Sequence, residues 1–187
     1  MAFAIASSAA SVQAEETRAL CPQLAQLDLA TLGTLTFDVD AARRQLGAKA
    51  SPDLGGADIV LRFYTESSGG RDSIDSTLAK AVRDRAAWHV TRGGVSGLQG
   101  KATMQFVLSD RDAAALDAAL VDPCLAHEPD FAPRTLPIMG GRHETCYDGA
   151  TFYLQIERAG GVRTIRHDCQ PRWRAGEIML LLRNATP

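Results

Sequence analysis

Apolar and polar residues alternate along residues 58–66, so that Leu61 and Phe63 would face one side of an extended chain. Alternation with a period of two is typical of a β-strand that buries one face. Residues 103–108 repeat this alternation over a shorter stretch, and residues 32–37 are also strand-like. The pattern therefore predicts three strands in the first two thirds of the chain, with residues 88–90 as a candidate for a short fourth strand.

Between these strands, apolar residues recur three and four positions apart, which is the spacing of one helix face. Each helical pattern begins near a capping residue or contains a proline suited to a first turn. The predicted helices cover residues 17–30 (with a break at Pro22), 38–46, 72–85 and 109–121. Residues 15–127 are therefore expected to form an αβ-rich part.

The pattern changes at a proline-bearing connection, residues 128–137, which is the best candidate for an internal boundary. Beyond it, three stretches with strand character follow one another: residues 147–158, 162–169 and 177–183. Successive strands with turn signals between them predict an antiparallel β-meander over residues 128–187. The expected fold class is therefore α+β, with an αβ-rich N-terminal part and a C-terminal β-meander packed together as one compact domain.

Gly160-Gly161 is a turn signal of the kind that joins two antiparallel strands. A turn at this position would place Phe152 opposite Cys169, and directly opposed residues share a face of the sheet. The apolar face of this hairpin would comprise Phe152, Leu154, Ile156, Ile165, His167 and Cys169. The polar face would comprise Tyr153, Gln155, Glu157, Thr164, Arg166 and Asp168.

The chain contains four cysteines, none of them in a C-x-x-C pair: Cys21, Cys124, Cys146 and Cys169. They follow residues 1–14, an uncharged stretch that ends like a signal-peptidase site and that we interpret as a partial signal peptide. An even number of cysteines behind an export signal predicts two disulfides formed in an oxidising compartment. The expected location is therefore periplasmic or secreted.

The hairpin favours one pairing of these cysteines. Cys146 would share the buried face with Cys169, but a direct cross-strand bond is excluded because Phe152 would lie opposite Cys169. A fold-back at Asp148-Gly149, itself a turn signal, would let Cys146 reach Cys169. The preferred pairing is therefore Cys146–Cys169 with Cys21–Cys124, and two other connectivities stay open.

Composition mainly excludes function classes. The 187 residues carry a net charge of −2, which argues against a nucleic-acid-binding protein because such proteins normally show a basic excess. No apolar run approaches the ~18 residues of a membrane span, so we expect none. From residue 133 to the end there are eight arginines and five acidic residues. This surplus reflects either a GC-rich bacterial genome or an anion-binding face near the C-terminus.

Two spacings are compatible with a metal site. His143-x-x-Cys146 and His167-x-Cys169 would supply a Cys₂His₂ zinc set, but cysteines in an oxidising compartment are expected to pair with each other. The same pairing would remove the free thiol that a catalytic cysteine needs. The glycine-rich loop in the middle of the chain does not fit a phosphate-binding loop, because Ala102 stands where a serine or threonine is required. We therefore expect no metal and no cofactor.

These observations predict a non-enzymatic bacterial binding module that recognises an envelope component or another protein. Its candidate binding residues lie on the polar face of the hairpin or just after it: Tyr153, Gln155, Arg166, Asp168, Arg172 and Arg174. The competing interpretation of that face is a simple solvated strand. The alternative function is a periplasmic hydrolase assembled from distant residues, with His143 and Glu144 as acid/base candidates.

Overall fold

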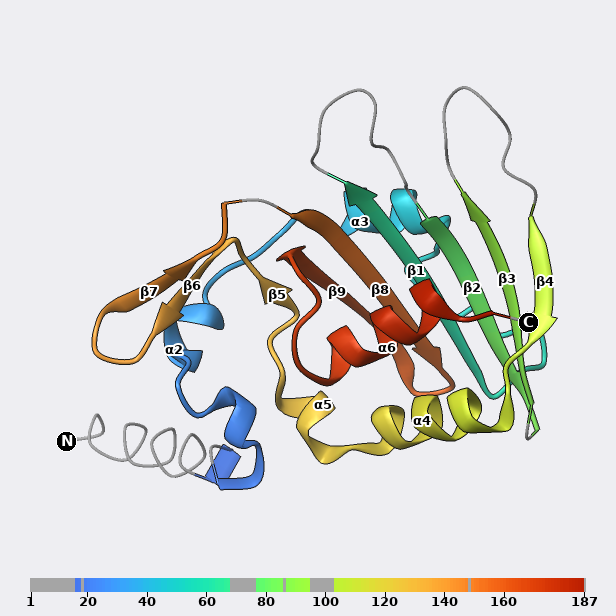
Figure 1. Cartoon of the computed structure of the whole chain (residues 1–187), viewed down its shortest axis with the longest axis horizontal. Helices are drawn as coiled ribbons and strands as arrows, with labels where there is room; N and C mark the ends of the chain where they lie inside the picture. Colours follow the sequence, from blue (N-terminus) through green and yellow to red (C-terminus); the bar gives the residue numbers. More distant parts are fainter. Residues whose placement is uncertain are drawn as a thin grey trace.

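The structure is a computed structural model of the chain, and it describes residues 16–17, 19–67, 77–85, 87–94, 103–147 and 149–186. Within these residues, seven strands form a twisted sheet with helices on both faces (Figure 1). In spatial order the strands are β4 (Met104–Val107), β3 (Ala87–Gly94), β2 (Thr77–Asp84), β1 (Ile59–Ser67), β8 (Ala150–Arg158), β9 (Gly161–Cys169) and β5 (Phe131–Ala132). Neighbouring strands are antiparallel except β5 and β9, which run parallel. The fold is α+β, as predicted.

Helices cover both faces of the sheet. One face carries α4 (Asp110–Val121), α5 (Pro123–His127) and α6 (Trp173–Asn184), and the opposite face carries α3 (Val39–Leu46) (Figure 1). We call the first the core face and the second the α3 face. The main core lies on the core face and includes the fully buried Leu61, Phe63, Leu154, Ile165, Leu116, Ile178 and Met179. Burial of each such side chain contributes roughly 1.5–3 kcal/mol.

The helices α3 and α4 form where they are predicted because each begins at a capping side chain. The Asp38 carboxylate accepts a hydrogen bond from the Ala41 amide, and the Ser109 hydroxyl accepts one from the Asp112 amide. The strands β1 and β4 also confirm their predictions. Local signals of this kind depend only on neighbouring residues, which is why the sequence reveals them.

A smaller unit lies beside β5, at the left of Figure 1. It consists of η1 (Pro22–Leu24), α2 (Leu29–Leu32) and a hairpin of β6 (Thr135–Ile138) and β7 (Arg142–Thr145). Its own buried cluster contains Cys21, Leu24, Leu27, Leu32, Cys124, Ala132 and Leu136. Because Cys124 belongs to α5, the small unit is connected covalently to the helix layer of the main body.

Both predicted disulfides are confirmed. The Cα atoms are 5.5 Å apart in Cys21–Cys124 and 6.3 Å apart in Cys146–Cys169, within the usual range for disulfides. Gly149 packs against the backbone of Cys169, and an added Cβ atom there would collide with the Cys169 carbonyl. The fold-back predicted at Asp148-Gly149 stays a prediction, because Asp148 lies outside the described residues.

The helix predicted over residues 72–85 is wrong from Thr77 onward, where the chain forms β2. Residues 71–76 lie outside the described part of the chain. Ala79 pairs with Phe63 of β1, and both side chains are buried on the core face. Pairing on both sides with β1 and β3 outweighs the local preference of an alanine-rich segment for a helix.

The third strand predicted for the meander is also wrong, because residues 173–184 form α6. Ile178, Met179 and Leu182 are fully buried along one side of this helix, whereas Leu180 is 40% exposed. A short apolar run fits either a strand or a helix, and here its packing against the sheet decides. Of the expected meander, the β8–β9 hairpin remains.

Residues 32–37 do not form the predicted strand. Leu32 ends α2, and the chain then follows an irregular connection to α3 without joining either sheet.

The β8–β9 hairpin has the predicted faces but a different register. Phe152 lies opposite His167, not Cys169, because the turn consists of Ala159 and Gly160. The shift is two residues, and a shift by an even number leaves every side chain on its predicted face.

The hairpin pairs with β1 through β8, so one sheet contains strands from both sides of the boundary expected near residue 128. No helix in the described ranges is long and apolar enough to cross a membrane.

Candidate functional site

The predicted polar face of the hairpin is partly internal. Gln155 and Glu157 are fully buried under α3 and the loop that follows it. The Arg62 guanidinium lies 2.6 Å from a Glu157 carboxylate oxygen, and the Asp53 amide donates to the other oxygen at 2.8 Å. The Gln155 side chain donates to the carbonyl of Lys49. The interpretation of this face as a simple solvated strand is therefore wrong for its central residues.

Tyr153, Arg166 and Asp168 lie together on the α3 face. The Arg166 guanidinium bonds the Asp168 carboxylate at 2.8 and 3.3 Å. It also lies 5.7 Å from the ring centre of Tyr153 and 5.4 Å from that of Phe131 on β5. Tyr64 stacks on the other side of Tyr153, with 6.0 Å between ring centres. Burial raises the pKa of Tyr153, and the charge of Arg166 opposes that shift. These residues form one lateral row across four strands.

The two later arginines make other contacts. Arg172 bonds Glu144 of β7 at 2.9 Å, which ties the small hairpin to the chain after β9. Arg174 bonds Asp122 and Glu177, each at 2.7 Å. Each guanidinium group therefore has a carboxylate partner on another segment, Glu144 for Arg172 and Asp122 for Arg174. Within the described residues, neither side chain forms a hydrogen bond or ion pair with Tyr153, Arg166 or Asp168.

The candidates for metal and acid/base chemistry are not assembled. Cys146 and Cys169, which the zinc alternative requires, are bonded to each other. His143 and Glu144 are adjacent on β7 and hence point to opposite faces. His167 is fully buried, and its Nδ1 accepts a hydrogen bond from the Arg172 amide at 3.1 Å. In the described part of the chain, no group of three His, Cys, Asp or Glu residues is arranged to hold a metal ion.

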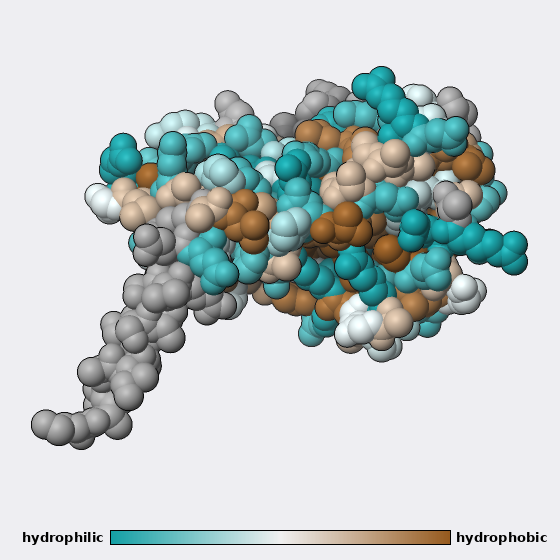
Figure 2. All heavy atoms as spheres, turned by 90° about the horizontal axis from the view of Figure 1, so that it is seen from below, coloured by the Kyte–Doolittle hydropathy of each residue, from teal (hydrophilic) through white to brown (hydrophobic). Residues whose placement is uncertain are grey.

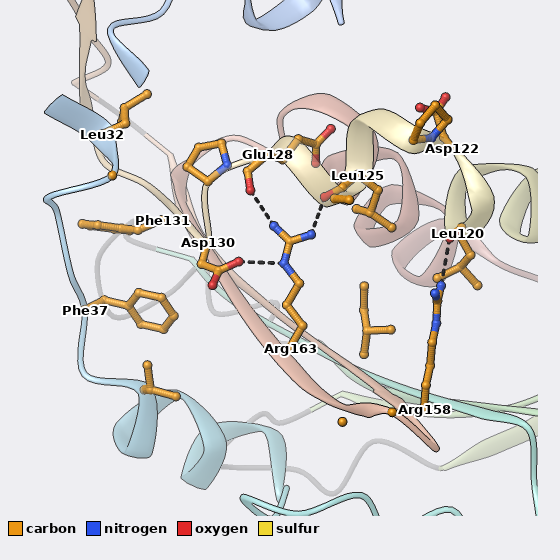
Figure 3. Close-up of a pocket in the computed structure, with 18 of the residues that line it drawn as sticks. Leu32, Phe37, Leu120, Asp122, Leu125, Glu128, Asp130, Phe131, Arg158 and Arg163 are labelled. Carbon is orange, nitrogen blue, oxygen red and sulfur yellow. Dashed lines mark hydrogen bonds and ion pairs between the residues drawn. The ribbon is translucent and has the colours of Figure 1, made fainter. Parts of the chain in front are cut away.

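A groove of about 1140 Å³ runs beside the hairpin turn and the start of β5 (Figure 3). Three segments line it: residues 32–39, residues 120–131 and residues 156–163. We call it the β9 groove. Its apolar lining includes Leu35, Phe37, Val39, Leu125, Phe131 and Ile156. Such a volume and lining are typical of ligand-binding clefts.

Apolar side chains of the β9 groove reach the surface. Val121 is 79% exposed and Leu35 is 38% exposed. Figure 2 shows the underside of the molecule, where hydrophobic residues emerge among hydrophilic ones. Phe37 and Phe131 pack at 5.7 Å between ring centres, and Phe131 in turn contacts Arg166. The groove is therefore continuous with the row of Tyr153 and Arg166.

Arg163 fixes one wall of the groove (Figure 3). Its Nε donates to the Asp130 carboxylate at 2.7 Å, and its two terminal nitrogens donate to the carbonyls of Leu125 and Glu128. A planar guanidinium can make three such bonds in one plane, which a lysine cannot. This side chain therefore holds the connection from α5 to β5 against β9.

Arg158, at the end of β8, is the other arginine of the groove. It donates to the Leu120 carbonyl at 2.8 Å and is otherwise exposed (Figure 3). Among the described residues it has no carboxylate within ion-pair distance. Arg158 is therefore the cation of the groove whose charge no acidic side chain compensates there.

The carboxylates of the groove have internal partners. Glu128 is buried and accepts hydrogen bonds from the amides of Arg174 and Ala175, at 2.6 and 2.9 Å, which caps the start of α6. Burial raises the pKa of Glu128, and the two amide donors oppose that shift. Asp122 is bound by Arg174, and Asp130 by Arg163.

The β9 groove was not predicted from the sequence. It combines three segments that are far apart in the chain, and one of them was expected to be a strand. The local signals near it were the proline-bearing connection that contains Phe131 and the Gly160-Gly161 turn signal, and neither indicates a cavity. Comparisons with protein-family models, curated proteins and solved structures find no match for this chain, so the roles of these residues are argued from the structure alone.

Proposed function

We propose that this chain is a non-enzymatic binding module of a bacterial periplasm or secretome, and that it binds a predominantly apolar ligand with an acidic group in the β9 groove. The observation that carries this proposal is an open apolar groove with a single uncompensated cation, Arg158. Apolar walls supply the affinity of most ligand sites, and a few polar groups fix the orientation of the ligand.

The state of the groove's carboxylates supports binding over catalysis. A general acid or base needs a side chain that can exchange a proton with the substrate. In the described lining of the groove, Asp122, Glu128 and Asp130 are each occupied by arginine or amide donors. For the hydrolase alternative, His143 and Glu144 lie on β7 and do not line the groove.

The disulfides support a site of action outside the cytoplasm. Disulfides persist in oxidising compartments and are rare where thiols are kept reduced. The uncharged stretch at residues 1–14 supports export through its resemblance to the end of a signal peptide.

The test uses anilinonaphthalene sulfonate, a fluorescent apolar anion, as the probe. Leu35→Glu places a negative charge in the groove, and Met104→Glu places one at a site of matching exposure on β4, at the opposite edge of the sheet. We expect the first variant to weaken dye binding about tenfold, equivalent to about 1.4 kcal/mol, and the second to leave it unchanged. Equal binding by both variants, each shown to be folded by circular dichroism, would contradict the proposal.

A further inference from the structure

The outer edge of β9, which borders the β9 groove, indicates what kind of ligand the groove binds. We propose that its ligand is an extended peptide segment of another protein, which binds as an additional strand along β9. This inference rests on the proposed function, because it names the ligand of the same groove.

Most of this edge lacks a neighbouring strand in the described residues. β8 pairs with β9 along its whole length, from Gly161 to Cys169, whereas β5 pairs only with Arg166 and His167. The stretch from Gly161 to Ile165 therefore has a strand on one side only. Open edges of this kind are where β-sheets accept a strand from another chain.

The register identifies the hydrogen-bonding groups that face outward. The Arg166 amide donates away from β8, to the carbonyl of Asp130 at 2.8 Å. Residues two apart in a strand orient their backbone groups in the same direction, so the amides and carbonyls of Thr164 and Val162 also point outward. No described backbone group outside β8 bonds to these two residues. They present two donors and two acceptors at this edge; Val162 is half-buried and Thr164 is 6% exposed, so an added strand would first meet the groups of Val162.

The chain's own connection from α5 does not occupy this edge. The carbonyls of Leu125 and Glu128 are bound by the Arg163 side chain instead of by the backbone of β9. Pro129, which follows, has no amide hydrogen to donate. The segment therefore forms the far wall of the groove and leaves the backbone edge beside it unpaired.

The groove has apolar walls on both faces of the sheet, as an added strand requires. Phe131 lies beside Arg166 in the sheet, so its side chain points to the α3 face. There its ring packs against the ring of Phe37. Leu125 and Ile156 belong to the core on the opposite face. Successive side chains of a strand point to alternate faces, so such a peptide would bury apolar side chains against both walls.

The positive charge of Arg158 favours a ligand that carries an acidic residue. Arg158 lies next to the turn where the open edge begins, and among the described residues its side chain bonds the Leu120 carbonyl and no carboxylate. A peptide with an acidic residue at the end that lies near the hairpin turn would supply the missing carboxylate. The expected ligand is therefore an apolar, extended segment with an acidic residue at one end.

The test is a selection from a displayed library of random heptapeptides, followed by calorimetry with the strongest synthetic hit. Val162→Pro removes the outward amide while leaving the ladder with β8 intact, and Val162→Ala is the matched control. We expect binding of the hit to fall at least tenfold in Val162→Pro and to change less than twofold in Val162→Ala. Arg158→Gln should weaken the hit about fivefold and reduce the salt dependence of its binding.

A second readout does not depend on the fold of any variant. Bound hit should slow hydrogen exchange at the amides of Val162 and Thr164 in the unmodified protein. Failure of any peptide to enrich, unchanged exchange at both amides, or full binding of the hit to a folded Val162→Pro would overturn strand addition. The proposed function would survive these results if the fluorescent dye still distinguished Leu35→Glu from Met104→Glu, and would fail with them if it did not.

Discussion

Burial fixes the protonation state of His167. Its Nδ1 accepts the Arg172 amide, so the ring proton lies on Nε2, and the imidazole packs edge-on against Trp173 with 5.5 Å between ring centres. Burial, with a smaller effect from the nearby arginines, lowers the pKa of His167 to about 3. The side chain is therefore neutral throughout the range in which an exposed histidine titrates, and it serves the core of the fold.

This shift predicts a dependence of stability on pH. Between pH 6.5 and 3 the unfolded chain protonates His167 but the folded chain does not, so the free energy of unfolding falls as the pH is lowered. The expected loss is about 2 kcal/mol between pH 7 and pH 5. Urea unfolding of the wild type and His167→Gln at both values measures it, because glutamine can still accept the Arg172 amide. The variant should lack this loss, and an equal pH dependence in the two proteins would contradict the assignment.

Individual side chains of the hairpin were predictable only in part. Their faces follow from the alternation of the sequence and survive a register shift of two residues. Their partners do not: Arg166 lies opposite Tyr153, and the burial of Gln155 and Glu157 comes from α3, which is more than a hundred residues away in the chain. Long-range packing of this kind has no local signal.

At the scale of elements, the successes and errors have a common origin. The sequence indicates α4 through the capping residue Ser109 and the helical spacing of apolar residues that follows. It indicates β1 through the strict alternation of apolar and polar residues. In the strand β2 and the helix α6, by contrast, the local preference for helix or strand is weak or opposite to the secondary structure that forms. Ala79 is extended because β1 and β3 pair on both sides of it, and Ile178 is helical because that geometry buries it against the sheet.

The connection into β8 requires glycine at position 149. Its φ is 148°, and a Cβ atom would lie within 3 Å of three backbone atoms of Cys169. Gly149→Ala should therefore destabilise the protein by about 3 kcal/mol or more, because the backbone of β8 or β9 must shift. The midpoint of urea unfolding, with an unchanged slope, is the measurement.

Gly140→Ala is the control for this change. Gly140 also has a positive φ, 77°, but an added Cβ atom there would meet nothing within 4 Å. Only the backbone strain of about 1–2 kcal/mol remains in that case. Equal losses in the two variants would show that the close approach to Cys169 has no energetic consequence.

At the scale of the molecule, the candidate site could not be predicted because no single segment contains it. Phe37, Phe131 and Arg158 come from three regions that meet only when the sheet and the small unit are assembled. The sequence did indicate Arg166 and Tyr153, whose row adjoins the groove through Phe131. The sequence therefore indicated residues that lie beside the groove, whose role in binding stays a prediction, and it gave no signal for the cavity itself.

The two disulfides should contribute unequally to stability. Cys21–Cys124 closes a separation of 103 residues and Cys146–Cys169 one of 23. Restriction of the unfolded chain then gives about 4.7 kcal/mol for the first bond and about 3.4 kcal/mol for the second. Replacing each pair by serine and measuring urea unfolding should show the larger loss for Cys21→Ser/Cys124→Ser. A larger loss for Cys146→Ser/Cys169→Ser would contradict this ranking.

Arg163 has a consequence for how this protein can vary in evolution. One guanidinium bonds a carbonyl of α5, a carbonyl of the connection between α5 and β5, and a carboxylate of the same connection. Lysine offers a compact ammonium and cannot reproduce this planar set of bonds. Among homologous sequences, we expect that those with arginine at position 163 also keep the length of that connection, and that those without this arginine do not.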